Sequence, residues 1–280
     1  MSYGPNPWQQ THWDWRAAGN FICGGAGGGL IVFTAIAGVD GSALAALMLA
    51  GLALVGLGLF CVWLEIGRPL RALRVFANPR TSWMAREAMA ATLLFPVGLA
   101  AAAAVPGFAL VAAALALTFM YCQGRMLQAA KGIPAWRGPW VPPLIVATGL
   151  AEGAGVFLAL APLHGNGMFP PLVPFGALVL VRVLVWLAYR KQLAAVAPRS
   201  HAAIQRANRV LQLVGTLVPL VLIAVIGANV VSGASVVVTA AIAGLAAAAA
   251  GAILKYELVT HAAFNQGFAL QHLPVRGTRS

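Results

Sequence analysis

Charged residues are scarce in this sequence. Only 9% of the 280 residues are Asp, Glu, Lys or Arg, whereas 61% are hydrophobic. A soluble domain carries roughly 25% charged residues, so this chain cannot cover a surface that faces water. The net charge of +12 reflects a shortage of acids, six against eighteen basic residues, and does not indicate a nucleic-acid-binding protein. The sequence therefore predicts an integral membrane protein.

Metal-ligating residues are also few. The three cysteines, Cys23, Cys61 and Cys122, lie far apart and form no CxxC pair. An iron–sulfur cluster or a structural zinc ion needs about four convergent ligands, so no metal site is expected in this chain. None of the five histidines falls inside an apolar stretch, which argues against a haem held between helices. Haem ligation by His12 or His261, each at the end of such a stretch, is left open.

Eight long apolar stretches dominate the chain. A helix that crosses the hydrocarbon core needs about 20 mostly apolar residues, and each stretch meets this length. No basic and apolar leader of a cleavable signal precedes the first stretch, so we expect it to be a permanent helix. We predict an all-α integral membrane protein with a single membrane domain over 1–280, in which an N-terminal segment (1–17) and a C-terminal tail (258–280) flank the spans. The eight transmembrane helices are expected at about residues 18–38, 43–64, 86–105, 108–130, 141–162, 171–190, 210–231 and 235–257.

The basic residues predict the orientation. The connections after the first, third, fifth and seventh spans carry no Lys or Arg, whereas those after the second, fourth and sixth are longer and basic. Sixteen of the eighteen Lys and Arg residues lie in these basic connections or near the two termini. Because basic loops stay in the cytoplasm, both termini and the basic connections are expected to be cytoplasmic. The two exceptions, Arg125 and Arg182, lie inside spans.

Ionisable residues near the cytoplasmic boundary form one candidate site. Glu65, Glu87 and Arg125 are expected at a similar depth, together with Asp14, His12 and Trp15. Charged residues in spans are costly and usually functional. A carboxylate can supply a proton while an arginine or a histidine binds a carbonyl oxygen, which suits the reduction of a lipid-soluble quinone. The alternative, that these side chains only anchor the helices among the headgroups, stays open.

Glu152 and Arg182 are the ionisable residues placed deepest in the membrane. Adjacent antiparallel spans would bring them together as a buried pair whose charges neutralise each other. The alternative is that they form a station on a proton path.

The first span contains the glycine-rich run CGGAGGGL, residues 23–30. Its small residues recur at intervals of four, as in Gly24 and Gly28, which is typical of closely packed membrane helices. The run does not follow a strand, so we interpret it as helix packing and not as a phosphate-binding loop.

The segment WLEIGRPLRALRVFANPRTSWMAREA, residues 63–88, resembles the signature of the DmsC/NrfD-like family, the membrane anchors of DMSO-reductase-type molybdoenzymes. The family pattern is a span that ends in HLG.P.RA, a loop, and a span that opens with S...(R/N)E. The eight-span plan and the segment IPAWRGPW (133–140) extend the resemblance along the chain. One position departs, because Glu65 stands where the family has histidine. The matching residues are Gly67, Pro69, Arg71, Ala72, Ser82 and Glu87.

The resemblance implies a complex of three subunits in a bacterial or archaeal cytoplasmic membrane. A molybdopterin subunit would carry out catalysis, a ferredoxin-like iron–sulfur subunit would carry electrons, and this chain would exchange them with menaquinone or ubiquinone. The quinone would bind near the cytoplasmic face, between the second, third and fourth spans. Partner docking is expected at 65–86, at 190–209 and on the C-terminal tail. The residues expected at the quinone are Glu87 and Glu65 for proton transfer and Arg125, Arg71, Trp15 and His12 for binding.

Two further stretches refine this expectation. WDWRAAGNFICGGAGGGL (13–30) and FNQGFALQHLPVRG (264–277) look similar to the membrane subunit of phenylacetyl-CoA:acceptor oxidoreductase, which implies phenylacetyl-CoA oxidation as the reaction of the complex. A stand-alone secondary transporter or proton channel is the alternative from another functional class. Transporters usually place polar groups at the bilayer midplane, and this chain has few of them there.

Overall fold

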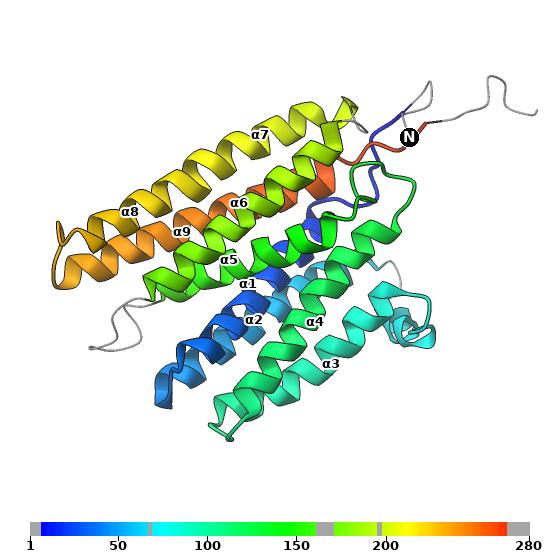
Figure 1. The fold of residues 1–280 in the computed structure, drawn as a ribbon. Coiled ribbons are helices and arrows are strands. Elements are labelled where there is room, and N and C mark those ends of the chain that lie inside the picture. The colour runs from blue at the N-terminus through cyan, green and yellow to red at the C-terminus, as the bar shows by residue number, and fades with distance from the viewer. Residues whose placement is uncertain (1–6, 67–68, 161–170, 195–197, 268–280) are drawn as a thin grey trace, which may run out of the picture.

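The computed structural model describes residues 7–66, 69–160, 171–194 and 198–267, which form a bundle of long helices (Figure 1). Eight helices among these residues are long and apolar enough to cross a membrane, which confirms the predicted all-α membrane fold. The described residues form no strand, only an isolated bridge between Gln9 and Phe264. The α-helices are α1 (Trp15–Ala37), α2 (Gly41–Glu65), α3 (Trp83–Ala102), α4 (Phe108–Ala129), α5 (Val141–Ala159), α6 (Leu172–Ala194), α7 (His201–Gln212), α8 (Val218–Gly227) and α9 (Ala234–Tyr256).

Two of the spans contain a π-helical turn. The turn Leu213–Leu217 joins α7 and α8, so that His201–Gly227 forms one span. α9 continues into a second π-helical turn at Glu257–His261. Such turns interrupt the regular backbone hydrogen bonding of an α-helix and are frequent at functional positions.

α1 and α5 form the centre of the bundle (Figure 1). Buried residues make up 72% and 78% of their apolar membrane-spanning stretches, compared with 22–44% for the other six spans. α1 packs against α2, α4, α5 and α9, and α5 packs against α1, α4, α6 and α9. Where α1 crosses α5, a Cβ atom on Gly153 would overlap the backbone of Gly29. The glycine-rich run therefore serves close helix packing, as the sequence predicted.

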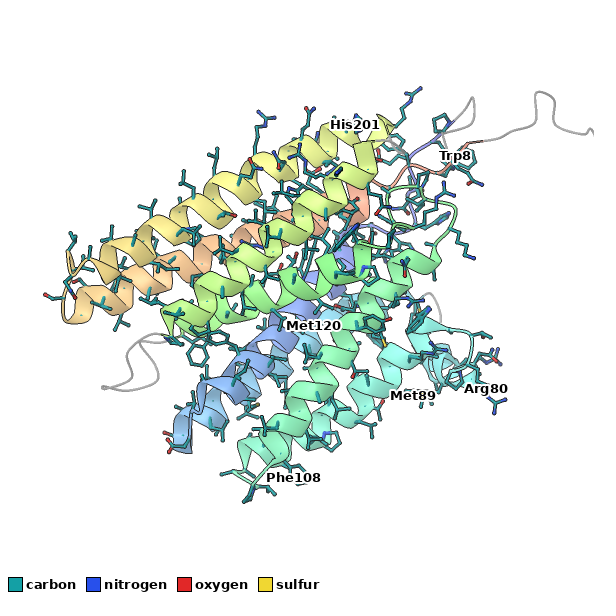
Figure 2. The ribbon with its side chains drawn as sticks, in the orientation of Figure 1. Trp8, Arg80, Met89, Phe108, Met120 and His201 are labelled. Carbon is teal, nitrogen blue, oxygen red and sulfur yellow. The ribbon has the colours of Figure 1, made fainter. Side chains whose placement is uncertain are left out.

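The outer flanks of the bundle are apolar. Met89 on α3 and Phe108 at the start of α4, both labelled in Figure 2, are 45% and 37% exposed. Trp8, Arg80 and His201 lie toward one end of the bundle, while Phe108 lies at the other (Figure 2). The exposed apolar side chains are those that a surrounding lipid bilayer would cover.

The two ends of the described chain meet at the end of the bundle that carries the basic connections. The backbone N–H of Asn265 donates to the Trp8 carbonyl at 2.9 Å. The indole N–H of Trp136, in the connection between α4 and α5, donates to the Leu258 carbonyl at 2.8 Å. These contacts join the segments around α1, α5 and α9 into one cap over the bundle.

The predicted docking loop at 190–209 is largely helical, which corrects the expectation of a long loop. α6 runs to Ala194 and α7 begins at His201. α7 is amphipathic, with Ile204 buried and Arg206 exposed. Counting only apolar residues placed the start of this span at residue 210, but a helix continues through amphipathic turns as long as one face stays packed.

Candidate functional site

A small cavity lies where the ends of α1, α2, α3 and α4 meet. Its volume is about 180 Å³, and its walls are mostly apolar. Two polar side chains, Asn20 of α1 and Glu65 of α2, also face it. The cavity therefore combines apolar surfaces with one amide and one carboxyl group. The remaining lining residues are Trp13, Ala17, Phe21, Val62, Ile66, Met84 and Met126.

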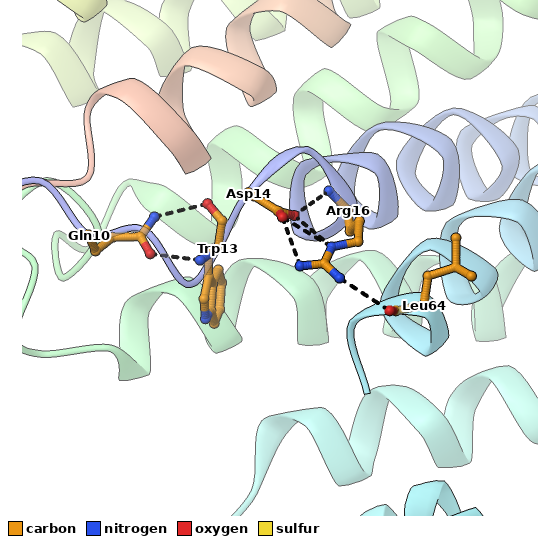
Figure 3. A network of polar contacts seen from close by, with 5 residues as sticks. All are labelled: Gln10, Trp13, Asp14, Arg16 and Leu64. Atoms are coloured by element: carbon orange, nitrogen blue, oxygen red, sulfur yellow. Dashed lines mark hydrogen bonds and ion pairs between the residues drawn. The ribbon is translucent and has the colours of Figure 1, made fainter. Parts of the chain in front are cut away.

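Polar contacts next to this cavity connect the segment before α1, the start of α1 and the end of α2 (Figure 3). The Gln10 side chain accepts from the Trp13 N–H at 2.7 Å and donates to the Trp13 carbonyl at 3.0 Å, which fixes the segment before α1. Arg16 binds the Asp14 carboxylate at 2.8 Å and donates to the carbonyl of Leu64 at 3.2 Å. Because Leu64 immediately precedes the cavity carboxyl, this network ties the start of α1 to the end of α2.

Glu65 is the carboxyl residue of the cavity lining, and it is partly buried. Its ionisable neighbours are Asp14, Arg16 and His12. The Arg16 guanidinium, which hydrogen-bonds Asp14, lowers the pKa of the Asp14 carboxyl below its usual value. Asp14 therefore stays ionised and bound to Arg16, while the Glu65 carboxyl faces the cavity.

Glu87 lies behind the cavity. Its side chain is 4% exposed and accepts a hydrogen bond from Asn20 Nδ2 at 3.0 Å. Gln123 of α4 faces the same carboxyl group and donates to the Asn20 carbonyl at 3.0 Å. Within the described part of the chain, Asn20 Oδ1 and Gln123 Oε1 are buried without a hydrogen-bond partner. Since Asn20 both lines the cavity and binds Glu87, it connects the buried carboxyl group to the cavity.

Arg125 was expected at the same depth as Glu87, but its side chain does not approach this carboxyl group. Its guanidinium carbon lies 4.5 Å from the centre of the Trp83 ring, and its Nη1 donates to the Tyr121 hydroxyl at 2.9 Å. Residues two positions apart on a helix lie on different faces, so Gln123 turns inward and Arg125 turns toward the start of α3. The side-chain partners of Glu87 among the described residues are therefore two neutral amides, those of Asn20 and Gln123.

Two other predicted binding residues, Trp15 and His12, are also absent from the described lining of the cavity. Trp15 is 57% exposed and His12 is exposed, whereas Trp13 faces the cavity. The side chain of Arg71 lies outside the described residues. The predicted position between the second, third and fourth spans is thus incomplete, because residues of α1 and the segment before it supply a large share of the lining.

A protein family matches most of the chain. The sequence model of the DMSO reductase anchor subunit (DmsC) matches residues 17–254, which include nearly all of the helical bundle. The chain belongs to the DmsC family. No curated protein matches it in sequence. As a DmsC-family member, the chain is the multi-pass membrane anchor of a DMSO reductase-type molybdoenzyme, and it anchors the catalytic and iron–sulfur subunits of that complex.

A buried ion pair lies deeper in this DmsC-family bundle. Lys255 Nζ lies 2.5 Å from Glu152 Oε2 and donates to the Phe21 carbonyl at 2.8 Å. The two charged side chains are at most 1% exposed. Gly25 and Gly251 leave room for them, because a Cβ atom on Gly25 would press on the ammonium group and one on Gly251 would press on the carboxylate. The pair therefore joins α1, α5 and α9 in the centre of the bundle.

The prediction that Arg182 pairs with Glu152 is wrong. Arg182 is fully buried, but its Nη1 donates to the Ala247 carbonyl at 2.8 Å and its Nη2 to the carbonyl of Gly215 in the π-helical turn. It acts on Glu152 only through its charge. Lys255 takes the place at the carboxylate because α9 packs along α5 and keeps this residue inside the bundle. The sequence predicts a different place for Lys255, because a lysine near the end of an apolar stretch is expected among the basic residues at the cytoplasmic end.

Two amide residues of the site were missed as well. Asn20 and Gln123 carry no charge, so a search for ionisable groups in the spans passed over them. Their signal was a polar side chain within an apolar stretch, which needs a partner in lipid just as a charge does.

Proposed function

We propose that this anchor subunit transfers electrons between the iron–sulfur subunit of its complex and a membrane quinone, menaquinone or ubiquinone, whose headgroup binds in the cavity between α1, α2, α3 and α4. The lining of that cavity carries the proposal, since Glu65 and Asn20 face a small apolar chamber and Asn20 binds the buried Glu87. A quinone takes up or releases two electrons and two protons. Two carboxyl groups beside one cavity match that demand for protons.

The size and walls of the cavity suit a quinone headgroup. Pockets for drug-sized ligands have roughly 300–1,000 Å³, so about 180 Å³ suits a compact quinone headgroup while the isoprenoid tail extends into lipid. Trp13 and Phe21 offer aromatic surface, and the thioethers of Met84 and Met126 adapt to the edge of a ring. Asn20 Oδ1, a buried acceptor without a partner among the described residues, would accept from a ring hydroxyl.

Glu65 and Glu87 reach the cavity in different ways. Glu65 faces it directly and lies beside the partly exposed pair of Asp14 and Arg16, and water would reach it from that side. Glu87 lies behind Asn20, to which it is hydrogen-bonded, and would supply a second proton to the cavity. We therefore assign the direct proton exchange to Glu65 and the supporting role to Glu87, the residue that matches the family pattern.

The end of the bundle that holds the cavity also carries the basic connections. We place this end in the cytoplasm, because basic loops stay inside. The ferredoxin-like iron–sulfur subunit would dock there and carry the molybdopterin subunit beyond it. The docking surface would consist of 65–86, the exposed face of α7 and the C-terminal tail, of which 268–280 lies outside the described residues. Electrons would then arrive beside the cavity and would not have to cross the ~30 Å core.

We propose phenylacetyl-CoA oxidation as the reaction of the whole complex. Its support is the similarity of the stretches 13–30 and 264–277 to the membrane subunit of phenylacetyl-CoA:acceptor oxidoreductase. Assaying the purified complex with phenylacetyl-CoA as electron donor tests this point, and reduction of DMSO without oxidation of phenylacetyl-CoA would contradict it. Purification in a mild detergent tests the complex itself, because a stand-alone transporter or channel would purify without iron- and molybdenum-containing partners.

Two carboxyl variants test the quinone site. In the purified complex, we expect Glu65→Gln to lower quinone-linked activity at least about tenfold, because glutamine cannot release a proton. Activity with an artificial dye that bypasses this subunit should persist. Glu87→Gln should act in the same direction with a smaller loss. Asp40→Asn is the matched control, since Asp40 is an exposed carboxyl residue at the start of α2, at the opposite end of the helix from Glu65. Normal quinone turnover in both glutamate variants would refute the proposal.

A further inference from the structure

A larger hollow opens at the same end of the bundle. Its volume is about 770 Å³, and it is bounded by the start of α3, the last turns of α4, the connection between α4 and α5, and the end of α6. Three cations, Arg125, Lys131 and Arg137, line it, and its described lining residues include no carboxylate. No described residue lines both this hollow and the smaller cavity. The hollow is therefore a separate site of positive charge.

Arg125 is held in place with a donor to spare. The Trp83 ring has two guanidinium groups near it, with the carbons of Arg86 and Arg125 at 4.1 and 4.5 Å from the ring centre. The Tyr121 hydroxyl accepts from Arg125 Nη1 at 2.9 Å. The Nε of Arg125 is buried, and nothing in the described part of the chain accepts its hydrogen bond. Buried donors in folded proteins are almost always paired, so the missing acceptor is expected from a bound group.

The wall formed by α6 presents the complementary chemistry. The amide of Gln192 packs against Gly138 so closely that a Cβ atom on Gly138 would overlap it. Its Oε1 is a buried acceptor with no partner among the described residues. Gln128 donates to the Gly138 carbonyl at 3.2 Å and so fixes this connection over the end of α4. A ligand that carries anionic oxygens and also a hydroxyl group would satisfy both walls.

The helix faces that continue from the hollow are apolar and exposed. On α4, Tyr121 and Leu117 lie seven and eleven residues before Gln128, on nearly the same face, and are 43% and 38% exposed. On α6, Val181 lies eleven residues before Gln192 and is 47% exposed. A free phosphate or an acidic segment of a partner subunit would not use these faces. Acyl chains that run toward the centre of the bilayer would cover them.

We propose that this hollow binds the headgroup of an anionic glycerophospholipid such as phosphatidylglycerol or cardiolipin. The phosphate lies at Arg125, Lys131 and Arg137, a headgroup hydroxyl donates to Gln192, and the acyl chains follow α4 and α6. Basic pockets between helices at the cytoplasmic boundary are a recurring mode of lipid recognition. The lipid holds the connection between α4 and α5 against the ends of α4 and α6. The proposal does not depend on the quinone chemistry, because the two sites share no described residue.

Native mass spectrometry of the full chain in a neutral detergent measures this binding. We expect dioleoylphosphatidylglycerol to bind at least about fivefold more tightly than dioleoylphosphatidylcholine. Lys131→Gln, at the exposed rim, should weaken the binding of phosphatidylglycerol about fivefold, which corresponds to about 1 kcal/mol per basic residue. Arg199→Gln is the matched control, because it removes an exposed cation outside the hollow, and it should leave the affinity unchanged.

Three results would overturn the proposal. Equal affinity for the two lipids would show that the hollow does not select an anionic headgroup. Binding of glycerol 1-phosphate as tight as that of phosphatidylglycerol would identify a site for free phosphate. Loss of the iron–sulfur subunit from the Lys131→Gln complex, with lipid binding unchanged, would assign the cations to partner docking. Arg125→Gln should weaken lipid binding further than Lys131→Gln, and if that variant fails to fold, Lys131→Gln decides by itself.

Discussion

The buried ion pair of Glu152 and Lys255 should stabilise the bundle and have little part in turnover. Lys255 is 0% exposed, and its ammonium contacts the Glu152 carboxylate at 2.5 Å and the Phe21 carbonyl at 2.8 Å. Removing one partner leaves the other as an uncompensated charge in the core, which typically costs about 3–5 kcal/mol. We therefore expect Glu152→Gln and Lys255→Met each to destabilise the folded chain by about that amount.

The double variant Glu152→Gln/Lys255→Met separates a pair interaction from two independent losses. It leaves no charge of the pair behind, and replacing a whole buried pair by uncharged groups is often close to neutral. Its destabilisation should therefore be far smaller than the sum of the two single variants. Unfolding of such proteins is commonly irreversible, so the measurement is the half-life of folded protein at fixed temperature in mild detergent.

Two glycine substitutions, one beside the ion pair and one away from it, test the space that Lys255 occupies. Gly25→Ala should resemble Lys255→Met, because the new methyl group would displace the ammonium group. Gly56→Ala adds the same methyl group on α2, where it would make only an ordinary contact of 3.5 Å with Phe95. Additive losses in the double variant would refute the pair interaction. An intact complex of Glu152→Gln without quinone turnover would refute the structural role and make Glu152 part of the chemistry.

Two further predictions concern the cavity and the centre of the bundle. Asn20→Leu keeps the volume of the side chain but removes the amide that binds Glu87. Quinone-linked activity should therefore fall at least about tenfold, while dye-linked activity persists. Equal loss of both activities would contradict this prediction. Gly153→Ala should prevent folding or assembly, because its Cβ atom would overlap the backbone of Gly29. Size-exclusion chromatography measures assembly, and elution of this variant as an intact complex would show the reasoning to be wrong.

The length of the apolar stretches was sufficient to predict the helices of this fold, because each span must satisfy its backbone hydrogen bonds internally. Local pattern also drew attention to Glu65, which lines the cavity, and to Glu87, which is buried behind it, and their roles stay predictions. The local pattern gave the wrong environment for Lys255. A residue near the end of an apolar stretch has the same sequence context whether the helix keeps it inside the bundle or extends it to the headgroups. The local pattern also failed at the partner of Glu152, since which of two neighbouring helices supplies a counter-ion depends on rotation and packing that no single segment encodes.

Arg125 illustrates the same limit at the candidate site. Arg125 lies near the end of α4, as its place in the apolar stretch predicts, but depth in the membrane does not specify the face of the helix on which a residue lies. A difference of two residues along the helix separates Gln123, which faces Glu87, from Arg125, which lies at the Trp83 ring. The inward-facing amides were missed because they carry no charge, and their only signal was a polar side chain within an apolar stretch. Only the packing of α1 against α4 brings Asn20 and Gln123 together.

The placement of the carboxyl groups bears on whether quinone chemistry moves charge across the membrane. Glu65 and Glu87 lie at or beside the cavity, at the end where the proposed iron–sulfur partner docks. Glu152 is sealed at 1% exposure against Lys255, and Asp40 lies in an exposed turn at the opposite end. In the proposed function, electrons and protons therefore enter from the same side, and no net charge crosses the bilayer. Turnover of the complex in sealed vesicles should build no membrane potential, and a potential detected with a voltage-sensitive dye would show that protons reach the quinone from the other side.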